Sequence, residues 1–185
     1  MSENRKLPEK DIQNVTFECK TEKEITSKDI DDFETFNKGV IARMKKLRQD
    51  NPLFESEITG SFVHIYAKTV IQDTIRENKS IEVVFAKDGP SLVGYSIVGV
   101  DREQKSGDFS YIGVSKDTQG QGIGKKLLEL RHERLRDIDI KSYTTNARSE
   151  ILAWYDKLGI TYRRIDKENA TPSTISVGTK VEVFT

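Results

Sequence analysis

The segment TQGQGIGKK, residues 118–126, has three alternate glycines followed by two lysines, and it is the stretch best suited to bind an anion. A chain that turns through glycines into a helix can direct unpaired backbone N–H groups toward an anion, and the helix dipole adds about half a positive charge there. Glycine also lets the backbone approach a phosphate without an intervening side chain. Lys125 and Lys126 add charge beside the same point. The pattern therefore predicts a di- or polyphosphate bound by residues 119–125.

Two well-known phosphate-binding loops do not fit these residues. A Walker loop has four residues between its glycines and ends in Gly-Lys-Ser/Thr, whereas GQGIGKK has three between its outer glycines and no hydroxyl residue. A dinucleotide-binding fingerprint places its third glycine where this chain has Lys125, and an acidic residue about twenty positions later, where the chain has Tyr143-Thr144-Thr145. The remaining pattern is Gln/Arg-x-x-Gly-x-Gly/Ala, which Gln119, Gly122 and Gly124 match.

This pattern resembles the pyrophosphate loop of the GNAT superfamily of acyl-CoA-dependent N-acyltransferases. The β-rich run DFSYIGV precedes it, and an amphipathic helix starts at the last glycine. Downstream, NARSEILAWYDKLGI (146–160) resembles the second signature of the family, in which an Asn ends a strand and a short helix carries a Tyr four residues before a Gly. The two segments stand in the family's order and separation. The resemblance covers roughly residues 80–160, and residues 1–80 match only in the order of their elements.

The resemblance implies an α+β GNAT fold, with a mixed, mostly antiparallel central sheet flanked by helices. In GNAT enzymes the strand before the loop splays from its neighbour, and the pantetheine arm of acetyl-CoA lies in the gap. Backbone groups of this strand then contact the arm and thioester, and one N–H stabilises the oxyanion of the tetrahedral intermediate. The implied cofactor-binding residues are Ile112, Gly113, Val114, Gln119, Gly120, Gln121, Gly122, Ile123, Gly124, Lys125, Lys126 and Asn146. From the residues alone, Gly113 fits a β-bulge equally well, and Asn146 fits a turn.

The resemblance also implies the catalytic residues. Tyr155 stands at the position of the general acid that protonates the departing CoA thiolate, although its pattern alone would indicate a core tyrosine. Asp108 stands near the start of the strand before the loop, where several family members place an acidic general base. Without the resemblance Asp108 would be an ordinary turn residue after Ser106-Gly107, and Asp101 and Glu103 are other candidates for the base.

The resemblance therefore implies an N-acetyltransferase that moves an acetyl group from acetyl-CoA directly to a primary amine in a ternary complex. Residues 21–80 are expected to build much of the acceptor side. Two alternatives stay open: a CoA-binding regulatory domain that has lost catalysis, and a toxin-type enzyme that acetylates aminoacyl-tRNA. The second alternative predicts a basic surface beside the acceptor cleft. A homodimer is also open, because family members often dimerise.

The periodicity of apolar residues and the turn residues predict the helices and strands that position these side chains. Thr26 and Asp29 predict the start of an amphipathic helix with an apolar stripe, which Asn51-Pro52 ends. The other expected elements are a strand at 12–20, a weaker helix at 55–77, strands at 81–87, 91–101 and 108–115, a helix at 124–137, a strand at 140–147, a helix at 149–159 closed by Gly159, and strands within ITYRRI and VGTKVEVFT.

Composition sets the remaining bounds. The 185 residues suit a single domain, 1–185, with a loose N-terminal segment at 1–11. Thirty basic residues balance thirty acidic ones, which argues against a nucleic-acid partner or an anionic membrane. The longest weakly polar run, SLVGYSIVGV, is about half the length of a membrane helix. The balanced charge and the shortness of this run predict a soluble, cytoplasmic protein.

Few residues suit a metal or reactive-thiol site. Cys19 is the only cysteine and is expected to be buried, and His64 and His132 have no metal-spaced partners, so no metal is expected. RHERLRD, residues 131–137, is expected to be an exposed side of a helix.

Overall fold

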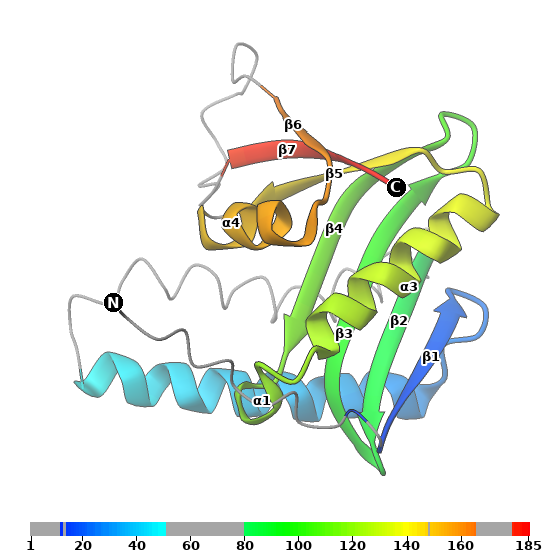
Figure 1. Ribbon diagram of the computed structural model, residues 1–185. Coiled ribbons are helices and arrows are strands. Elements are labelled where there is room, and N and C mark those ends of the chain that lie inside the picture. Colours follow the sequence, from blue (N-terminus) through cyan, green and yellow to red (C-terminus); the bar gives the residue numbers. More distant parts are fainter. Residues whose placement is uncertain (1–11, 13, 51–79, 148, 166–178) are drawn as a thin grey trace.

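The computed structural model describes residues 12, 14–50, 80–147, 149–165 and 179–185, and within this part it does not describe the side chains of residues 40, 41, 43–50, 108 and 109. The elements are β1 (Val15–Thr21), α1 (Ser27–Asp50), β2 (Ser80–Asp88), β3 (Ser91–Asp101), β4 (Ser106–Val114), the 3-10 helix η1 (Lys116–Thr118), α3 (Ile123–Asp137), β5 (Ser142–Ala147), α4 (Ser149–Leu158), β6 (Tyr162–Arg164) and β7 (Thr179–Phe184) (Figure 1). This is the expected order, and the helix expected at 55–77 lies outside the described residues.

A single seven-stranded sheet carries the strands in the order β1-β2-β3-β4-β5-β7-β6. Neighbouring strands are antiparallel except β4 and β5, which are parallel. The short turns made the β2–β3–β4 meander predictable: Gly89 takes a left-handed φ of 55° in the first turn. In the second turn the Asp101 carboxylate accepts hydrogen bonds from the N–H groups of Glu103 and Gln104. The mixed α+β architecture predicted from the sequence is confirmed.

Helices cover both faces of the sheet because successive strand residues point to opposite sides. On one face, Phe33 and Phe36 of α1 pack with Phe85 and Tyr95 of the central strands. On the other face, α3 crosses β2, β3 and β4 (Figure 1), where its Leu127 packs against Val84. The sheet therefore separates α1 from α3, which lies on the opposite face.

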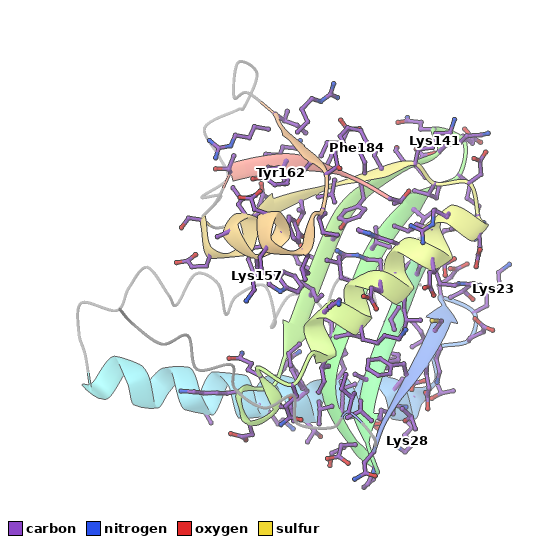
Figure 2. The ribbon with its side chains drawn as sticks, viewed as in Figure 1. Lys23, Lys28, Lys141, Lys157, Tyr162 and Phe184 are labelled. Atoms are coloured by element: carbon purple, nitrogen blue, oxygen red, sulfur yellow. The ribbon has the colours of Figure 1, made fainter. Side chains whose placement is uncertain are left out.

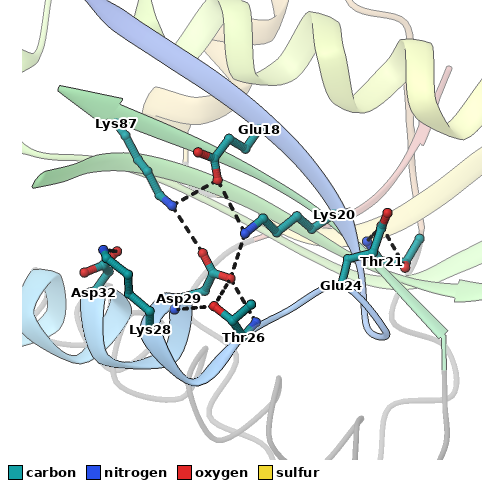
Figure 3. Close-up of polar contacts among 9 residues, drawn as sticks. All are labelled: Glu18, Lys20, Thr21, Glu24, Thr26, Lys28, Asp29, Asp32 and Lys87. Atoms are coloured by element: carbon teal, nitrogen blue, oxygen red, sulfur yellow. Dashed lines mark hydrogen bonds and ion pairs between the residues drawn. The ribbon is translucent and has the colours of Figure 1, made fainter. Parts of the chain in front are cut away.

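The first turn of α1 is fixed by a buried carboxylate (Figure 3). Asp29, 2% exposed, accepts hydrogen bonds from the N–H (2.9 Å) and the hydroxyl (2.7 Å) of Thr26, and its own N–H donates to that hydroxyl oxygen (3.3 Å). Lys20 of β1 and Lys87 of β2 donate to the same carboxylate at 2.8 and 3.2 Å, and Glu18 lies 3.4 and 3.0 Å from the two ammonium groups. The capping box predicted from Thr26 and Asp29 is thus present and ties α1 to two strands.

We expect Asp29→Asn to lower the free energy of unfolding at pH 7 by about 2 kcal/mol, because it leaves two partly buried lysines short of a carboxylate. Burial by itself raises the pKa of Asp29, but hydrogen bonds from Lys20, Thr26 and Lys87 outweigh burial and hold that pKa well below its usual value. A carboxyl whose pKa is lower in the folded than in the unfolded state stabilises the fold above the unfolded value of about 3.9 and loses this effect as the pH falls. Urea unfolding should therefore show a smaller difference between wild type and variant at pH 3 than at pH 7.

The exposed ion pair of Asp32 with Lys28 supplies the matched control. Asp32→Asn should change the free energy of unfolding by less than about 0.5 kcal/mol at either pH. A difference for Asp29→Asn that is small at pH 7, or equal at both pH values, would contradict the assigned role of Asp29.

Candidate functional site

The site begins where β5 leaves β4. The two strands pair only at Ser106–Ser142 and Gly107–Tyr143, and in Figure 1 they diverge from that end. Beyond these pairs, the hydroxyl of Thr145 in β5 donates a hydrogen bond to the carbonyl of Ser110 in β4 at 3.1 Å. The remainder of β4 keeps β3 as its strand partner. The stretch beyond Gly107 and Tyr143 in which β4 and β5 are not paired, called the gap below, lies at the position that the family resemblance implies.

Gly107 permits the close approach at the closed end of this gap. A Cβ at this position would lie 2.5 Å from Cβ of Tyr143 and 2.9 Å from a methyl group of Val98. We expect Gly107→Ala to lower the free energy of unfolding by about 2 kcal/mol, because backbone and rigid side-chain atoms must move. Gly39 of α1 is the control, since a Cβ there meets nothing within 4 Å and alanine favours a helix. Thermal unfolding in which both variants are as stable as wild type would contradict this account of the closed end.

The pairing of β4 with β3 decides which backbone groups face the gap. Ser115 donates its N–H to the carbonyl of Val93 at 2.8 Å, so its backbone points toward β3. Backbone groups alternate sides along a strand, and the register is regular here, so Gly113 also points toward β3, opposite Tyr95. The backbone N–H and C=O groups of Ile112 and Val114 therefore point the other way, toward β5. The β4–β5 ladder does not extend to these two residues. No register shift falls at Gly113; the β3–β4 irregularity lies between Val98 and Val100.

The glycine loop joins this gap to the start of α3. Gly120 and Gly122 have left-handed φ values of 81° and 85°, which only glycine adopts readily, and Gly122 is the residue that caps α3. Among the described residues no side chain caps α3, and its first turn has no acidic residue. The first N–H bonded to the loop is that of Lys126, which donates to the carbonyl of Gly122 at 3.0 Å. The preceding amides of α3 are therefore directed at the loop with no internal acceptor, as an anion site requires.

Gly124 is explained by space, since its backbone is helical. A Cβ on Gly124 would lie 3.5 Å from Cζ2 of Trp154 in α4 and 3.6 Å from Cγ2 of Val114 in β4. The bare side of Gly124 thus faces the region between β4 and α4. Two of the three glycines serve the turn itself, and the third lies within van der Waals reach of the side chains of Trp154 and Val114.

The remaining loop side chains are mostly exposed. Gln119 donates from Nε2 to the carbonyl of Val114 at 3.3 Å, which places its amide at the end of β4. Lys125 and Lys126 are 60% and 43% exposed and lie 3.8 and 3.9 Å from Glu129. Ile123 is 1% exposed and belongs to the core, so only its backbone can contact a ligand. The positive charge at the loop is therefore available to a bound anion.

Asn146 and Gln121 have different surroundings. Asn146 is exposed in β5 and pairs with Lys180 of β7, so it lies within a strand and not in a turn. Gln121 donates from Nε2 to the carbonyl of Asp117 at 3.4 Å, which links the loop to η1.

Tyr155 lies on the inner side of α4. It is 2% exposed and packs in the core cluster that includes Ile112 at its edge, with its ring 5.7 Å from that of Trp154 and 6.1 Å from that of Tyr162. The end of its helix is fixed as expected: Gly159 has a φ of 69°, and Ile160 donates its N–H to the carbonyl of Tyr155 at 3.0 Å. The fold therefore brings Tyr155 and β4 together from distant parts of the sequence.

The prediction that residues 131–137 form an exposed helix side is wrong for Arg131 and His132, which are 1% and 6% exposed. Both lie on the face of α3 that also carries Leu128 and Leu135, and this face packs on the sheet. Arg131 donates from Nη2 to the hydroxyl of Tyr143 at 2.6 Å, with its guanidinium carbon 4.4 Å from the ring centroid, and Nε2 of His132 lies 3.0 Å from the same hydroxyl. The sequence reasoning missed this polar cluster, although its spacing relative to the two leucines was a visible signal.

The candidates for the general base lie at the end of β3, in the β3–β4 turn and in β4. Asp108 lies in β4, and its side chain is outside the described residues. Asp101 accepts turn hydrogen bonds, as given above, and Glu103 is exposed in that turn. The assignment of the base to Asp108 therefore stays a prediction.

Other expectations concern cysteine, metals and membranes. Cys19 is exposed and not buried as expected, because β1 is an edge strand. Among the described residues, no three His, Cys, Asp or Glu side chains gather as a metal site would require. The described helices include none that is long and apolar enough to cross a membrane.

Two surface hollows border the site without including the loop. One, of about 360 Å³, lies between α1 and the residues that follow β4, among them Ser115 and Lys116. The other, of about 310 Å³, lies between α4 and β5 to β7 and is lined by Asp156 and Tyr162. Neither hollow is lined by residues 119–124.

The mixed sheet, whose one parallel pair diverges next to a glycine loop and the N-terminus of α3, is the arrangement that the GNAT resemblance implies. The family model described as "Acetyltransferase (GNAT) domain" matches residues 33–171. The chain therefore belongs to the GNAT acetyltransferase family, as its resemblance predicted, and is an acyltransferase by family. None of the curated proteins matches its sequence.

Solved structures share the fold. The PaiA N-acetyltransferase of Thermoplasma acidophilum in complex with coenzyme A has a TM-score of 0.59 and 15% identity, with 92% of this chain and 99% of that chain covered. The catalytic domain of the Tetrahymena GCN5 histone acetyltransferase in complex with coenzyme A has a TM-score of 0.61 and 14% identity, with 92% of each chain covered. An acyl-CoA N-acyltransferase of Pseudomonas aeruginosa has a TM-score of 0.61 and 13% identity, with 92% and 98% covered.

Proposed function

We propose that this protein is an N-acetyltransferase that transfers the acetyl group of acetyl-CoA directly to a primary amine in a ternary complex. The observation that carries the proposal is the divergence of β4 from β5, which leaves the backbone of Ile112 and Val114 facing a gap. The loop with the free N-terminus of α3 begins a few residues beyond β4. Acetyl-CoA would use both features, the unpaired edge of β4 for its thioester arm and the N-terminus of α3 for its pyrophosphate. Two structures of this fold, named above, hold coenzyme A.

In the proposed reaction the amine nitrogen attacks the thioester carbonyl carbon, and a backbone N–H of Ile112 or Val114 donates to the oxyanion that forms. Such a donor contributes up to several kcal/mol when it is positioned in advance by the sheet. Collapse of the intermediate breaks the C–S bond and leaves the acetyl group on nitrogen. Tyr155 gives its hydroxyl proton to the thiolate, and Asp108 takes a proton from the amine. Exchange with water then restores both side chains.

Acetylation of a panel of primary amines tests the proposed activity. The panel should include polyamines, lysine-containing peptides and aminoacyl-tRNA. Released CoA is measured with a thiol reagent, and acetylated products are identified by mass spectrometry. We expect at least one amine to be acetylated at a rate that depends on the protein. Tight binding of acetyl-CoA without transfer to any amine would instead support a CoA-binding domain that has lost catalysis.

A further inference from the structure

A buried polar cluster connects α3, β5 and α4, and the reaction proposed above uses only one of its members. It consists of Arg131, His132, Tyr143 and Tyr155, each 6% exposed or less. Among the described residues, Arg131 forms no ion pair with a carboxylate, and its Nε and Nη1 atoms are buried without hydrogen-bond partners. A buried charge of this kind is costly, and an apolar residue of similar size is often at least as stable in its place. Stability alone therefore does not account for Arg131.

The hydroxyl of Tyr143 is the centre of the cluster. A tyrosine hydroxyl donates one hydrogen and accepts up to two. Arg131 can only donate, so its Nη2 occupies one acceptor position at 2.6 Å. Nε2 of His132 lies 3.0 Å away. Tyr155 packs in the same core cluster and, together with burial, contributes to raising the pKa of Tyr143. Burial raises the pKa of Tyr143 and outweighs the opposing effect of Arg131, so Tyr143 keeps its hydrogen.

The ring of His132 decides where that hydrogen points. Burial, together with Arg131 and Arg136, lowers the pKa of His132 to about 3, so the ring is neutral near pH 7 and carries one hydrogen. If the hydrogen is on Nε2, His132 and Arg131 both donate to Tyr143, whose own hydrogen then goes to the oxygen of Tyr155. If the hydrogen is on Nδ1, the Tyr143 hydroxyl donates to Nε2 of His132. The Tyr155 hydroxyl then donates its hydrogen to the oxygen of Tyr143.

We propose that Arg131 and His132, acting through Tyr143, orient the hydroxyl of Tyr155 so that its hydrogen is presented to the sulfur of coenzyme A. His132 carries its hydrogen on Nε2, Tyr143 donates to the Tyr155 oxygen, and the Tyr155 hydrogen is free for the thiolate. Arg131, His132 and Tyr143 are positioning residues that do not touch the ligand. The inference rests on the function proposed above.

The first test concerns the tautomer of His132 in the protein without ligand. The chain has two histidines, His64 and His132, so ¹⁵N spectra of histidine-labelled protein contain two rings, and His132→Gln identifies the one of interest. We expect a neutral ring protonated on Nε2 throughout the range pH 5–8. Protonation on Nδ1 would overturn the inference, whatever the protein binds.

The second test uses coenzyme A itself and needs no acceptor. A hydrogen bond from Tyr155 stabilises the thiolate, so the thiol pKa of bound coenzyme A, read from the ultraviolet absorbance of the thiolate, should lie about one unit below that of the complex with Tyr155→Phe. Tyr143→Phe should raise that thiol pKa as Tyr155→Phe does, and the double variant should match Tyr155→Phe alone. A wild-type thiol pKa in Tyr143→Phe, or effects that add in the double variant, would overturn the inference.

Arg131→Met separates positioning from packing, and it remains available if Tyr143→Phe folds poorly. Methionine removes the buried charge and keeps much of the volume, so the melting temperature should stay the same or rise, while the thiol pKa of bound coenzyme A should rise toward that of Tyr155→Phe. A wild-type thiol pKa in Arg131→Met would overturn the role of Arg131.

Tyr162→Phe is the matched control. Tyr162, labelled in Figure 2, lies on β6 with its ring 6.1 Å from that of Tyr155, and its hydroxyl donates to exposed Asp156 at 3.0 Å. This variant should leave the thiol pKa unchanged, and a rise as large as that of Tyr143→Phe would overturn the specific role of Tyr143. Failure of coenzyme A to bind the wild type would overturn the proposed function, and this inference with it. Binding with an unshifted thiol pKa would overturn the inference alone.

Discussion

Gly124→Glu is expected to weaken the binding of acetyl-CoA at least about a hundredfold, a loss of about 2.7 kcal/mol. Its side chain would start 3.5 Å from Trp154 and 3.6 Å from Val114, and so would enter the region between β4 and α4. It would also place a negative charge where the loop is proposed to hold the pyrophosphate. The fold itself should not suffer, because glutamate favours a helix more than glycine does and is stabilising in the first turn.

Gly124→Ala is the control for this prediction, because its Cβ makes ordinary van der Waals contacts and the family pattern accepts alanine at this position. It should bind acetyl-CoA within about threefold of wild type and be more stable by up to about 1 kcal/mol. Calorimetric titration and thermal unfolding of the three proteins measure both effects. Gly122 is less suitable for substitution, because its φ of 85° would strain any side chain. Wild-type affinity in Gly124→Glu would contradict the assignment of the loop.

Tyr155→Phe is expected to reduce kcat for acetyl transfer about a hundredfold, because the departing thiolate loses its proton donor. The ring of Tyr155 would keep its packing against Trp154 and Tyr162, so the dissociation constant of acetyl-CoA should stay within about twofold of wild type. Steady-state rates with the amine found in the panel, together with calorimetric titration, separate the two quantities. This separation also distinguishes an enzyme from a binding domain, which has no turnover to lose.

Tyr162→Phe again serves as the comparison, since it removes a neighbouring hydroxyl that is bonded to Asp156. It should keep the wild-type kcat. An unchanged kcat in Tyr155→Phe would show that Tyr155 is a packing residue of α4, as its burial alone would suggest.

Local signals in the sequence were sufficient for most of the fold. Thr26 and Asp29 marked the start of α1, Gly159 marked the end of α4, and short polar turns predicted the β2–β3–β4 meander. In each case the chemistry that fixes the element lies within a few residues of it. The GNAT resemblance, confirmed by the family model, extended these local signals to the whole architecture.

The site required information that local patterns do not contain. The identity of the gap-facing backbone groups depends on the register of β4 with β3, and a shift of one residue would exchange Ile112 for Gly113. The buried cluster was missed because charge was given more weight than position: Arg131 and His132 stand between Leu128 and Leu135 on the packed face of α3. Tyr143, their common partner, follows them by 12 and 11 positions on the next strand, whose place in the sheet is set by its short pairing with β4.

The most direct test of the central claim is calorimetric titration of acetyl-CoA into the wild-type protein, with acetylpantetheine titrated in parallel. The loop and the N-terminus of α3 are proposed to hold the pyrophosphate, which acetylpantetheine lacks. We therefore expect acetyl-CoA to saturate one site per chain and acetylpantetheine to bind at least about a hundredfold more weakly. Absence of acetyl-CoA binding, or equal affinity for the two compounds, would contradict the account.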